Sequence, residues 1–469
     1  MADSKLEELY NWVDDRTGIK KVTAEALDEP IRGGARFAYV FGSVLMFLFG
    51  LQVATGIFLT MYYVPSADHA HASVAYIQKA VAGGWLLRGI HHYGASAMIV
   101  LAVVHLAQAF LWGAYKNKRE LLWGAGVLML LIVLGFSFTG YLLPWDQAAF
   151  FGTKVGASIA GEIPVVGPVQ QRIMLGGTDL TTITLSRFFM THVFLLPLGL
   201  AALIGLHLYF FRRASPAGPF KETKPVRYER FYPKQLFKDT IAILLCFIWL
   251  VVMAKVVPAE LGPQADPTAD YLARPPWYFM PLFQLLKYFP GKTAIIPTAI
   301  LPAVVFGVLF LLPFIDRRPE RNPFKRPFAT LLLTFTLGGA VGLIFLAQYQ
   351  DRVHPEYGPK LKKQEEEMKE FLAKPFEPQI LGKAVAVGPV APKAYAISCA
   401  SCHGDAGQGG PIAPSLKGVT SLPQRTKADL LKILDNSEAY GLVAPMPKSF
   451  PKLSAEDKEQ IVDWVGTLK

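Results

Sequence analysis

Four histidines lie in two long apolar segments at nearly equal spacing. His91 and His105 are 14 residues apart, which in an α-helix leaves them about 40° from eclipsed and roughly 21 Å apart along the axis. His192 and His207 are 15 residues apart, about 60° from eclipsed and roughly 22 Å apart. Each segment therefore presents two imidazoles on one face. Two such helices facing each other would offer two bis-histidine sites.

A single histidine in an apolar helix is more often a hydrogen-bonded core residue than a ligand. Four at matched spacing favour ligands, because unpaired polar groups in hydrocarbon are costly and usually functional. His92 differs from His105 by about 140°, so it is predicted to be a neighbour of the site. Glycines at the same period could leave bare backbone for flat macrocycles, although such glycines also serve helix packing. They are Gly42 and Gly56 in one segment, and Gly126 and Gly140 in another.

A second chemical signal lies near the C-terminus, in the sequence Cys399-Ala400-Ser401-Cys402-His403. This C-x-x-C-H pattern predicts a haem attached through two thioethers, with His403 as its proximal ligand. Zinc binding is the alternative, which the neighbouring histidine pairs disfavour. Met446 is the one other soft or imidazole ligand after Lys393, so elimination makes it the distal ligand. His/Met ligation favours a raised potential. The expected cofactors are two non-covalent haems b and one haem c.

The elements that must position these residues are membrane-spanning helices. The chain has 469 residues, of which 52% are hydrophobic and 18% charged, a composition typical of a polytopic membrane protein. Seven stretches have the length that a helix needs to cross a bilayer. They are residues 36–64, 89–112, 121–143, 188–211, 240–257, 294–315 and 328–348. The predicted fold class is therefore an all-α bundle of seven transmembrane helices.

The charge distribution predicts the orientation. The net charge of +11 would suit nucleic acid, but Lys and Arg gather in the N-terminal segment and in alternate loops. By the positive-inside rule the N-terminus is cytoplasmic and the C-terminus lies outside. Bacteria attach haem c on the outer face, so the two inferences agree on a bacterial inner membrane. Cys246 stands alone in the fifth helix as a buried thiol, which excludes a disulfide framework.

Four regions are expected along the chain. Residues 1–212 form a four-helix di-haem bundle, and 213–350 add three helices. Residues 351–392 form a charged linker, in which 360–374 is a solvated helix or tether. Residues 393–469 form a small α-helical cytochrome c domain. The Pro-rich outer loop 258–292 is too long for a simple turn and is predicted to be functional.

Residues 10–348 resemble cytochrome b of the Rieske/cytochrome b quinol-oxidising complexes. The resemblance rests on the histidine pairs and on three motifs, which are Gln52-Val53-Ala54-Thr55-Gly56, Gly140-Tyr141-Leu142-Leu143-Pro144-Trp145-Asp146-Gln147 and Pro275-Pro276-Trp277-Tyr278. It implies that His91 and His192 hold an outer, low-potential haem, and that His105 and His207 hold an inner, high-potential one. Arg88 resembles the arginine that pairs with a haem propionate. The last 75 or so residues resemble small class I cytochromes c, with Trp464 in the C-terminal helix.

The resemblance also implies two quinone sites. The family oxidises quinol outside, near 145–151 and the Pro-Pro-Trp-Tyr segment, where most members carry a proton-accepting Glu at the position of Pro276. Proline cannot accept a proton, so Glu162 or Asp146 is expected to do so, with Tyr278 as a hydrogen-bonding partner. Loss of that Glu tends to accompany low-potential quinols, which indicates menaquinol. Lys238 and Asp239 resemble a proton-delivering pair of the inner quinone site. A helix-start Asp beside an interfacial Lys is an equal alternative.

The favoured interpretation is a fused cytochrome b and c subunit of a quinol:cytochrome c oxidoreductase, coupled to proton translocation. The expected partners are a Rieske iron–sulfur protein, a downstream cytochrome c or oxidase, membrane lipid and a second copy of the chain. A di-haem anchor that relays electrons between a dehydrogenase and quinone is the main alternative, but it leaves the Trp-Asp-Gln and Pro-Pro-Trp-Tyr segments unexplained. A transporter with buried histidines is the third.

Overall fold

The computed structural model describes residues 2–221, 225–376, 391–404, 406–409, 413–423, 425–440, 449–450 and 453–468. The chain divides into two compact units, Met1–Phe376 and Glu377–Lys469, each of which is considered by itself. Met446, the predicted distal ligand, lies outside the described residues.

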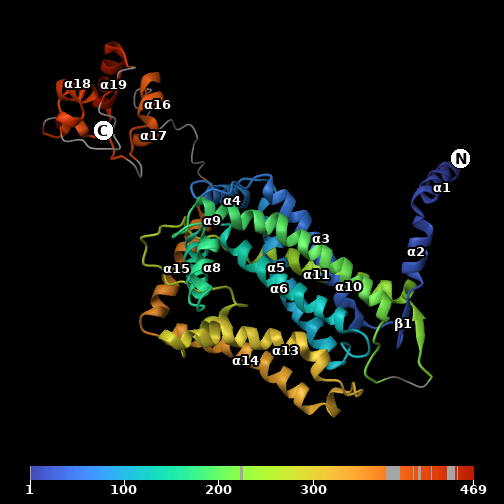
Figure 1. Ribbon diagram of the computed structural model, residues 1–469. Coiled ribbons are helices and arrows are strands. Elements are labelled where there is room, and N and C mark those ends of the chain that lie inside the picture. The colour runs from blue at the N-terminus through green and yellow to red at the C-terminus, as the bar shows by residue number, and fades with distance from the viewer. Residues whose placement is uncertain are drawn as a thin grey trace. The chain divides into compact units, whose positions relative to one another are not determined.

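Unit 1 is a bundle of long helices (Figure 1). The long helices are α3 (Val40–Thr60), α5 (Gly84–Leu111), α6 (Glu120–Leu142), α10 (Leu196–Ala214), α11 (Leu236–Val256), α13 (Leu301–Ile315) and α14 (Pro327–Val353). The shorter helices are α1 (Ala2–Thr17), α2 (Ile19–Leu27), α4 (Ala70–Lys79), α7 (Gln147–Gly161), α8 (Gly167–Leu175), α9 (Thr182–Met190), α12 (Met280–Leu286) and α15 (Tyr357–Ala373). Strands β1 (Pro30–Arg32) and β2 (Tyr228–Arg230) pair antiparallel, a small addition to the predicted all-α fold.

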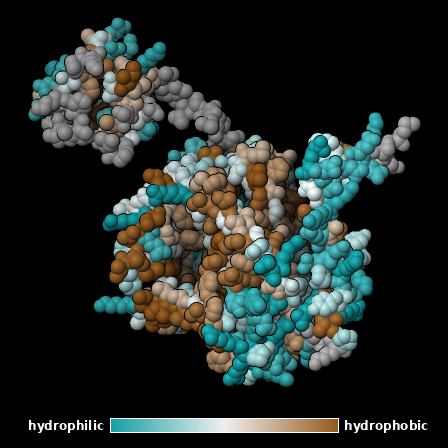
Figure 2. Space-filling view, turned by 45° about the vertical axis from the view of Figure 1, so that its right-hand side comes forward, coloured by the Kyte–Doolittle hydropathy of each residue, from teal (hydrophilic) through white to brown (hydrophobic). Residues whose placement is uncertain are grey.

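The prediction of seven membrane-length helices is confirmed for the described part of the chain. The fourth and fifth spans, Thr182–Ala214 and Phe231–Val256, begin earlier than predicted, because α9 continues through a π-helical turn into α10 and a second π-helical turn precedes α11. The seventh span, Pro327–Val353, runs five residues beyond 348. Large apolar side chains such as Phe328 and Phe335 stand exposed on α14, and apolar residues gather over the flank of the bundle (Figure 2). Hydrocarbon solvates such a surface.

The core of the bundle lies between α3, α5, α6, α10 and α11 and includes Leu48, Ile99 and Leu250. Close approach of backbones sets this packing at one position. A Cβ placed on Gly89 would lie 2.6 Å from the Cβ of Ala254. Glycine at 89 therefore allows α5 and α11 to meet, which brings the end of α11 beside the start of α5.

A buried ionic cluster joins the α5–α6 loop to the α13–α14 loop. Asp316 accepts hydrogen bonds from Tyr115 at 2.5 Å, Lys116 at 2.7 Å and Arg326 at 3.1 Å. The Lys116 and Arg326 side chains are only 5% and 6% exposed. Although burial alone would raise the pKa of Asp316, the hydrogen bonds from Lys116 and Tyr115 lower it below its ordinary value. The cluster ties the first helices of the bundle to the last.

Helix α15 follows the seventh span and packs against α4 with its C-terminal end. Lys79 donates a hydrogen bond to the carbonyl of Phe371 and lies 3.9 Å from the centroid of its ring. The His71 and Phe371 rings are 5.1 Å apart, and the Tyr76 and Phe376 rings 5.3 Å apart. The predicted charged segment is thus helical, but its end is docked on unit 1 and is not a free tether.

Unit 2 contains α16 (Lys393–Ser398), α17 (Ala400–His403), α18 (Lys427–Asp435) and α19 (Ala455–Thr467). Helices α18 and α19 begin with reciprocal capping boxes, Thr426 with Asp429 and Ser454 with Asp457, which satisfy their first backbone donors. The Tyr395 and Trp464 rings, 4.3 Å apart, centre the core. This core packs Cys399 against the C-terminal helix that the sequence predicted.

We predict that Asp316→Ala lowers the free energy of unfolding by about 3–5 kcal/mol, because it leaves two buried cations without their partner. Thermal denaturation of the purified full-length protein measures this effect. Asp28→Ala is the matched control, since the Asp28–Arg230 pair is exposed on both sides and is worth at most about 1 kcal/mol. Equal effects of the two substitutions would contradict the structural role of the cluster.

Candidate functional site

His91 and His192 face each other across the interior of the bundle. His91 lies in α5 and His192 in the π-helical turn Thr191–Leu195 that joins α9 to α10. Their ring centroids are 6.3 Å apart and their planes are at 65°. Imidazole nitrogens bind first-row metals at about 2 Å, so two rings on opposite sides of one iron need nearly this centroid separation. The first histidine pair, His91 and His192, therefore fits bis-histidine ligation of one haem.

Two threonines orient these imidazoles. The hydroxyl of Thr55 donates to the carbonyl of Leu51 at 2.7 Å and lies 2.9 Å from Nδ1 of His91. A hydroxyl has one hydrogen, so Thr55 accepts from Nδ1–H, and Nε2 keeps its lone pair for a metal. Thr139 does the same, donating to Gly135 at 2.9 Å and meeting Nδ1 of His192 at 3.0 Å. Sequence reasoning missed both, although each directly precedes a predicted haem glycine.

The π-helical turn explains the unequal histidine spacing. A π-helix hydrogen-bonds from residue i to i+5 and so holds one more residue in its turn than an α-helix does. The 15-residue separation of His192 and His207 therefore presents both rings on one face, much as 14 residues do for His91 and His105. Such turns are frequent at functional sites.

The four predicted glycines differ in how much space a side chain would have at each position. A Cβ on Gly140 would lie 2.6 Å from Cε1 of His192, and one on Gly56 would lie 3.4 Å from Cε1 of His91. On Gly126 it would lie 3.6 Å from Cε1 of His207, while Gly42 has no neighbouring atom within 4 Å. Glycine at 140 is thus required by the ligand ring itself. The open space at Gly42 is compatible with a flat ring.

His105 and His207, the second histidine pair, have buried Nδ1 atoms that make no hydrogen bond within the described part of the chain. A Cβ on Gly126 would stand beside His207 as one on Gly140 would beside His192. Unpaired imidazole nitrogens in a membrane interior are costly. The pair therefore fits a second haem site, but with a different environment from the first. The ring of His92 packs edge-on against Tyr93, and the facing pair uses His91, as its spacing predicted.

Arg88 joins α5 to the long loop that follows α11. Its guanidinium is buried and donates to Gln78 at 2.9 Å, to the carbonyl of Ala259 at 3.1 Å and to the carbonyl of Glu260. Three donors are thus engaged with protein, out of the five that a guanidinium carries. Within the described part of the chain, two N–H groups are left that could serve a propionate near the first histidine pair.

Asp146 is an anchor between the Trp-Asp-Gln segment and the same loop. It caps α7, accepting from the N–H of Ala149 at 2.9 Å, and its second oxygen accepts from the N–H of Gly262 at 2.9 Å. The carbonyl of Gly262 in turn meets Nε2 of His71 at 2.8 Å. Both carboxylate oxygens of Asp146 are therefore engaged with backbone, an arrangement that suits positioning better than proton uptake.

The structure brings the segment 145–151 beside residues 271–274, which directly precede the Pro-Pro-Trp-Tyr segment. Phe151 of α7 stacks on Tyr271 with centroids 5.5 Å apart. The Tyr141 hydroxyl donates to the carbonyl of Ala148 at 3.0 Å and lies 3.4 Å from the carbonyl of Arg274. Tyr141 directly follows Gly140, so this junction adjoins the first histidine pair. Tyr278 packs on the bundle core, and burial raises the pKa of its phenol to about 12.

Glu162 lies away from this junction. It is exposed and follows the last residue of α7, 11 residues beyond Phe151 and therefore roughly 16 Å further along the helix axis. Direct proton transfer needs hydrogen-bond distance or one intervening water. Neither acid predicted from the sequence has its carboxylate free beside Tyr278.

Lys238 and Asp239 diverge at the start of α11. Asp239 is buried and accepts from Ser43 and Gln235, both at 2.7 Å. Nζ of Lys238 instead lies 4.8 Å from the ring centroid of Phe37. The two side chains therefore make separate contacts. Ser43 and Gln235 are contacts that the sequence did not indicate.

In unit 2, α17 carries the C-x-x-C-H motif. Cys399 is buried in the core. Nδ1 of His403 lies 2.9 Å from the carbonyl of Pro414. Because a carbonyl only accepts, Nδ1 carries the proton and Nε2 is left to bind a metal. This donor arrangement fits a covalently attached haem with His403 as the proximal ligand.

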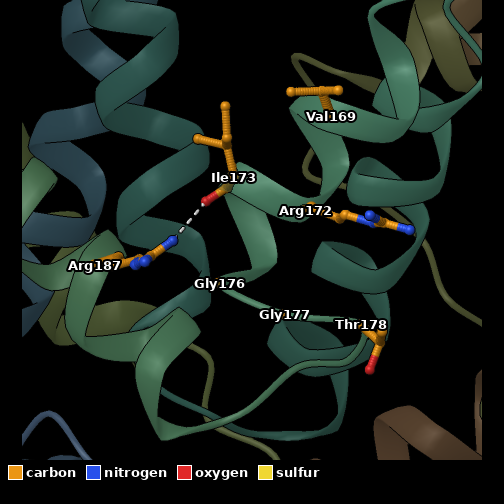
Figure 3. A pocket seen from close by; sticks show the side chains of 7 residues that line it. All are labelled: Val169, Arg172, Ile173, Gly176, Gly177, Thr178 and Arg187. Atoms are coloured by element: carbon orange, nitrogen blue, oxygen red, sulfur yellow. Dashed lines mark hydrogen bonds between the residues drawn. The ribbon is translucent and has the colours of Figure 1, made fainter.

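A separate hollow of about 560 Å³ lies on the surface between α8 and α9. Figure 3 shows Arg187 reaching the carbonyl of Ile173, at 3.1 Å, while Arg172 points elsewhere. None of the histidine ligands lines it. The hollow is therefore not part of the redox site.

A membrane-length bundle that presents paired imidazoles in its interior, followed by a C-x-x-C-H domain, defines a membrane cytochrome. Family models agree. "Cytochrome b/b6/petB" matches residues 27–215, "Cytochrome b(C-terminal)/b6/petD" matches 264–354, and "Cytochrome C oxidase, cbb3-type, subunit III" matches 391–465.

Known proteins give the same result. The chain is 36% identical over 365 residues to the cytochrome bc complex cytochrome b subunit of Chlorobaculum thiosulfatiphilum, covering 76% of this chain and 83% of that protein. It is 42% identical over 222 residues to the menaquinol:cytochrome c reductase cytochrome b subunit of Geobacillus thermodenitrificans, covering 46% and 99%. A solved hyperthermophilic respiratory Complex III aligns with TM-score 0.66 and 26% identity, covering 77% of this chain and 96% of that one.

The chain belongs to the cytochrome b/b6 family and carries a C-terminal cytochrome c domain of the cbb3 type. It is the cytochrome b of a bc-type quinol:cytochrome c oxidoreductase fused to a cytochrome c domain. Such domains imply haem b and haem c, and both the fold and the family expected from the sequence are confirmed.

We predict that Tyr278→Phe lowers quinol oxidation about two- to tenfold, the effect of losing one hydrogen bond, without moving the inflections of the pH–rate profile. A phenol with a pKa of about 12 stays protonated throughout the working range, so it donates but does not titrate. Steady-state rates between pH 5 and 9 test this, with the exposed Tyr62 replaced by Phe as the control. Loss of one limb of the profile would contradict the role of a neutral donor.

Proposed function

We propose that the chain oxidises quinol at the outer membrane face and divides its two electrons. One electron goes to a Rieske iron–sulfur partner and on to the haem c of unit 2. The other crosses the membrane through two haems b, held by the first and second histidine pairs, to a quinone site near Lys238 and Asp239. Protons released outside and taken up inside couple the reaction to proton translocation.

The observation that carries this proposal is the facing of His91 and His192, next to the junction of α7 with the Tyr271–Tyr278 segment. Quinol bound at that junction would lie near a haem held by the first pair. Haem supplies reversible one-electron chemistry there. The chain itself contributes imidazole ligands with assigned tautomers, the Tyr278 donor and aromatic walls that exclude water.

We place the N-terminus in the cytoplasm and unit 2 on the periplasmic side of a bacterial inner membrane, on the basis of the loop charges. Menaquinol is the proposed substrate, since relatives in Geobacillus thermodenitrificans and Bacillus subtilis are named menaquinol:cytochrome c reductases. A second copy of the chain and a downstream cytochrome c or oxidase complete the assembly.

Glu162 is proposed as the surface end of a proton path, since α7 holds it away from Tyr278. We predict that Glu162→Gln slows quinol oxidation less than Tyr278→Phe does, because a relay at the surface is more easily bypassed by water than a direct donor is replaced. Stopped-flow haem b reduction compares the two variants. An unchanged rate in Glu162→Gln would remove Glu162 from the path.

Met446 remains the proposed distal ligand of haem c. We predict that Met446→Ala leaves the haem covalently attached, because Cys399 and Cys402 are untouched, but lowers its potential and alters its spectrum. Denaturing gels stained for haem and an optical redox titration separate the two effects. An unaltered potential would contradict the assignment.

Haem stoichiometry tests the proposal as a whole. The full-length protein purified with its partners should contain two haems b per covalent haem c and should reduce cytochrome c with quinol. His192→Ala should remove one haem b and abolish turnover, whereas the matched variant His92→Ala should keep both. A protein with two haems b but no quinol-dependent cytochrome c reduction, even with its Rieske partner present, would contradict the proposal.

A further inference from the structure

The two histidine pairs differ in what their second ring nitrogens meet. In the first pair, each Nδ1 meets a threonine hydroxyl whose own hydrogen is already donated to its helix, at 2.9 Å for Thr55 and 3.0 Å for Thr139. In the second pair, Nδ1 of His105 and Nδ1 of His207 are buried and make no hydrogen bond within the described residues.

On α6 a backbone carbonyl stands at each ring, that of Phe136 at His192 and that of Leu122 at His207, 14 residues apart. The carbonyls therefore do not distinguish these two histidines, whereas the threonine hydroxyl does. The residue before Gly140 is Thr139, and the residue before Gly126 is Ala125. On α3 the same comparison sets Thr55 before Gly56 against Phe41 before Gly42.

An acceptor on Nδ1–H gives an imidazole more anionic character and makes Nε2 a stronger donor to iron. A stronger donor stabilises the oxidised form, so the potential falls. Both histidines of the first pair have a hydroxyl acceptor on Nδ1, and within the described residues neither histidine of the second pair has one. The threonines therefore lower the reduction potential of a haem held by the first pair. A haem held by the second pair has no such hydroxyl and keeps a higher potential.

We propose that Thr55 and Thr139 are positioning residues that make the first histidine pair the more reducing haem site, and so direct electrons toward the second pair. This rests on the proposed function, in that both pairs must hold haem. The family resemblance implies the order of the potentials. The hydroxyls supply a residue-level cause that can be moved from one site to the other.

Removing an acceptor tests the first half. In the full-length protein, Thr139→Val should raise the potential of one haem b and lower the equilibrium constant for electron transfer from the first to the second site about two- to tenfold, the worth of one hydrogen bond. A tenfold change is about 59 mV for one electron. Thr139→Ser keeps the hydroxyl and should restore the native value. Thr60→Val is the control on α3, since among the described residues the Thr60 hydroxyl bonds only its own helix, at 2.7 Å to Ile57.

Adding an acceptor tests the second half. Ala125→Thr places a hydroxyl beside His207 as Thr139 stands beside His192. It should lower the potential of the haem b held by the second pair, by an amount that changes the same equilibrium constant about two- to tenfold. Ala125→Val fills the same space without a hydroxyl and should leave that potential within the error of the native protein. Optical redox titration gives the potentials, and low-temperature electron paramagnetic resonance shows which ferric haem has changed.

The outcomes separate the inference from the function beneath it. Opposite shifts at the two sites, with Ser and Val controls near the native values, support the inference. It is overturned if Thr139→Val shifts no more than Thr60→Val, or if Ser shifts as much as Val. If Thr139→Val loses its haem, the potentials of Thr139→Ser, Ala125→Thr and Ala125→Val still test the inference. A native protein lacking two bis-histidine haems b would instead overturn the proposed function.

Discussion

The structure depends on holding two imidazoles on opposite sides of one position in a medium that solvates neither. His91 and His192 come from helices joined by no short connection, and their centroids are 6.3 Å apart. Each ring is held by a threonine on a third or fourth helix, α3 or α6. Four helices must therefore pack correctly before either ligand is in place. The close contact of Gly89 with Ala254 and the ionic cluster at Asp316 belong to the same requirement, because both fix helix positions.

Around the first pair, side chains that look catalytic are often structural. Both carboxylate oxygens of Asp146 accept hydrogen bonds from backbone N–H groups. Arg88 donates three hydrogen bonds, one to Gln78 of α4 and two to carbonyls of the loop after α11. Together they hold that loop against α7 and α5, on the side where Tyr271 stacks on Phe151. The polar groups at this end of the bundle therefore position backbone, and Tyr278 packs on the bundle core.

The last helix of unit 1, α15, is held against α4 near its C-terminal end. In α15, charged residues face solvent along most of the length, yet Phe371 near its end and Phe376 just after it pack against α4. Burial of these rings, with the Lys79 contact, fixes the place where the chain leaves unit 1.

Local pattern alone determined the seven spans, the choice of His91 over His92 and the C-x-x-C-H site, because helix period, hydropathy and ligand spacing act within short stretches of chain. It predicted both histidine pairs despite their unequal spacing, but not the π-helical turn that reconciles 14 residues with 15. Only the tertiary structure decided that Thr55 and Thr139 contact His91 and His192, that Asp146 is an anchor and that Lys238 and Asp239 diverge. Those outcomes depend on which groups from distant segments compete for the same donor or acceptor, and spacing along the chain carries no information about that competition.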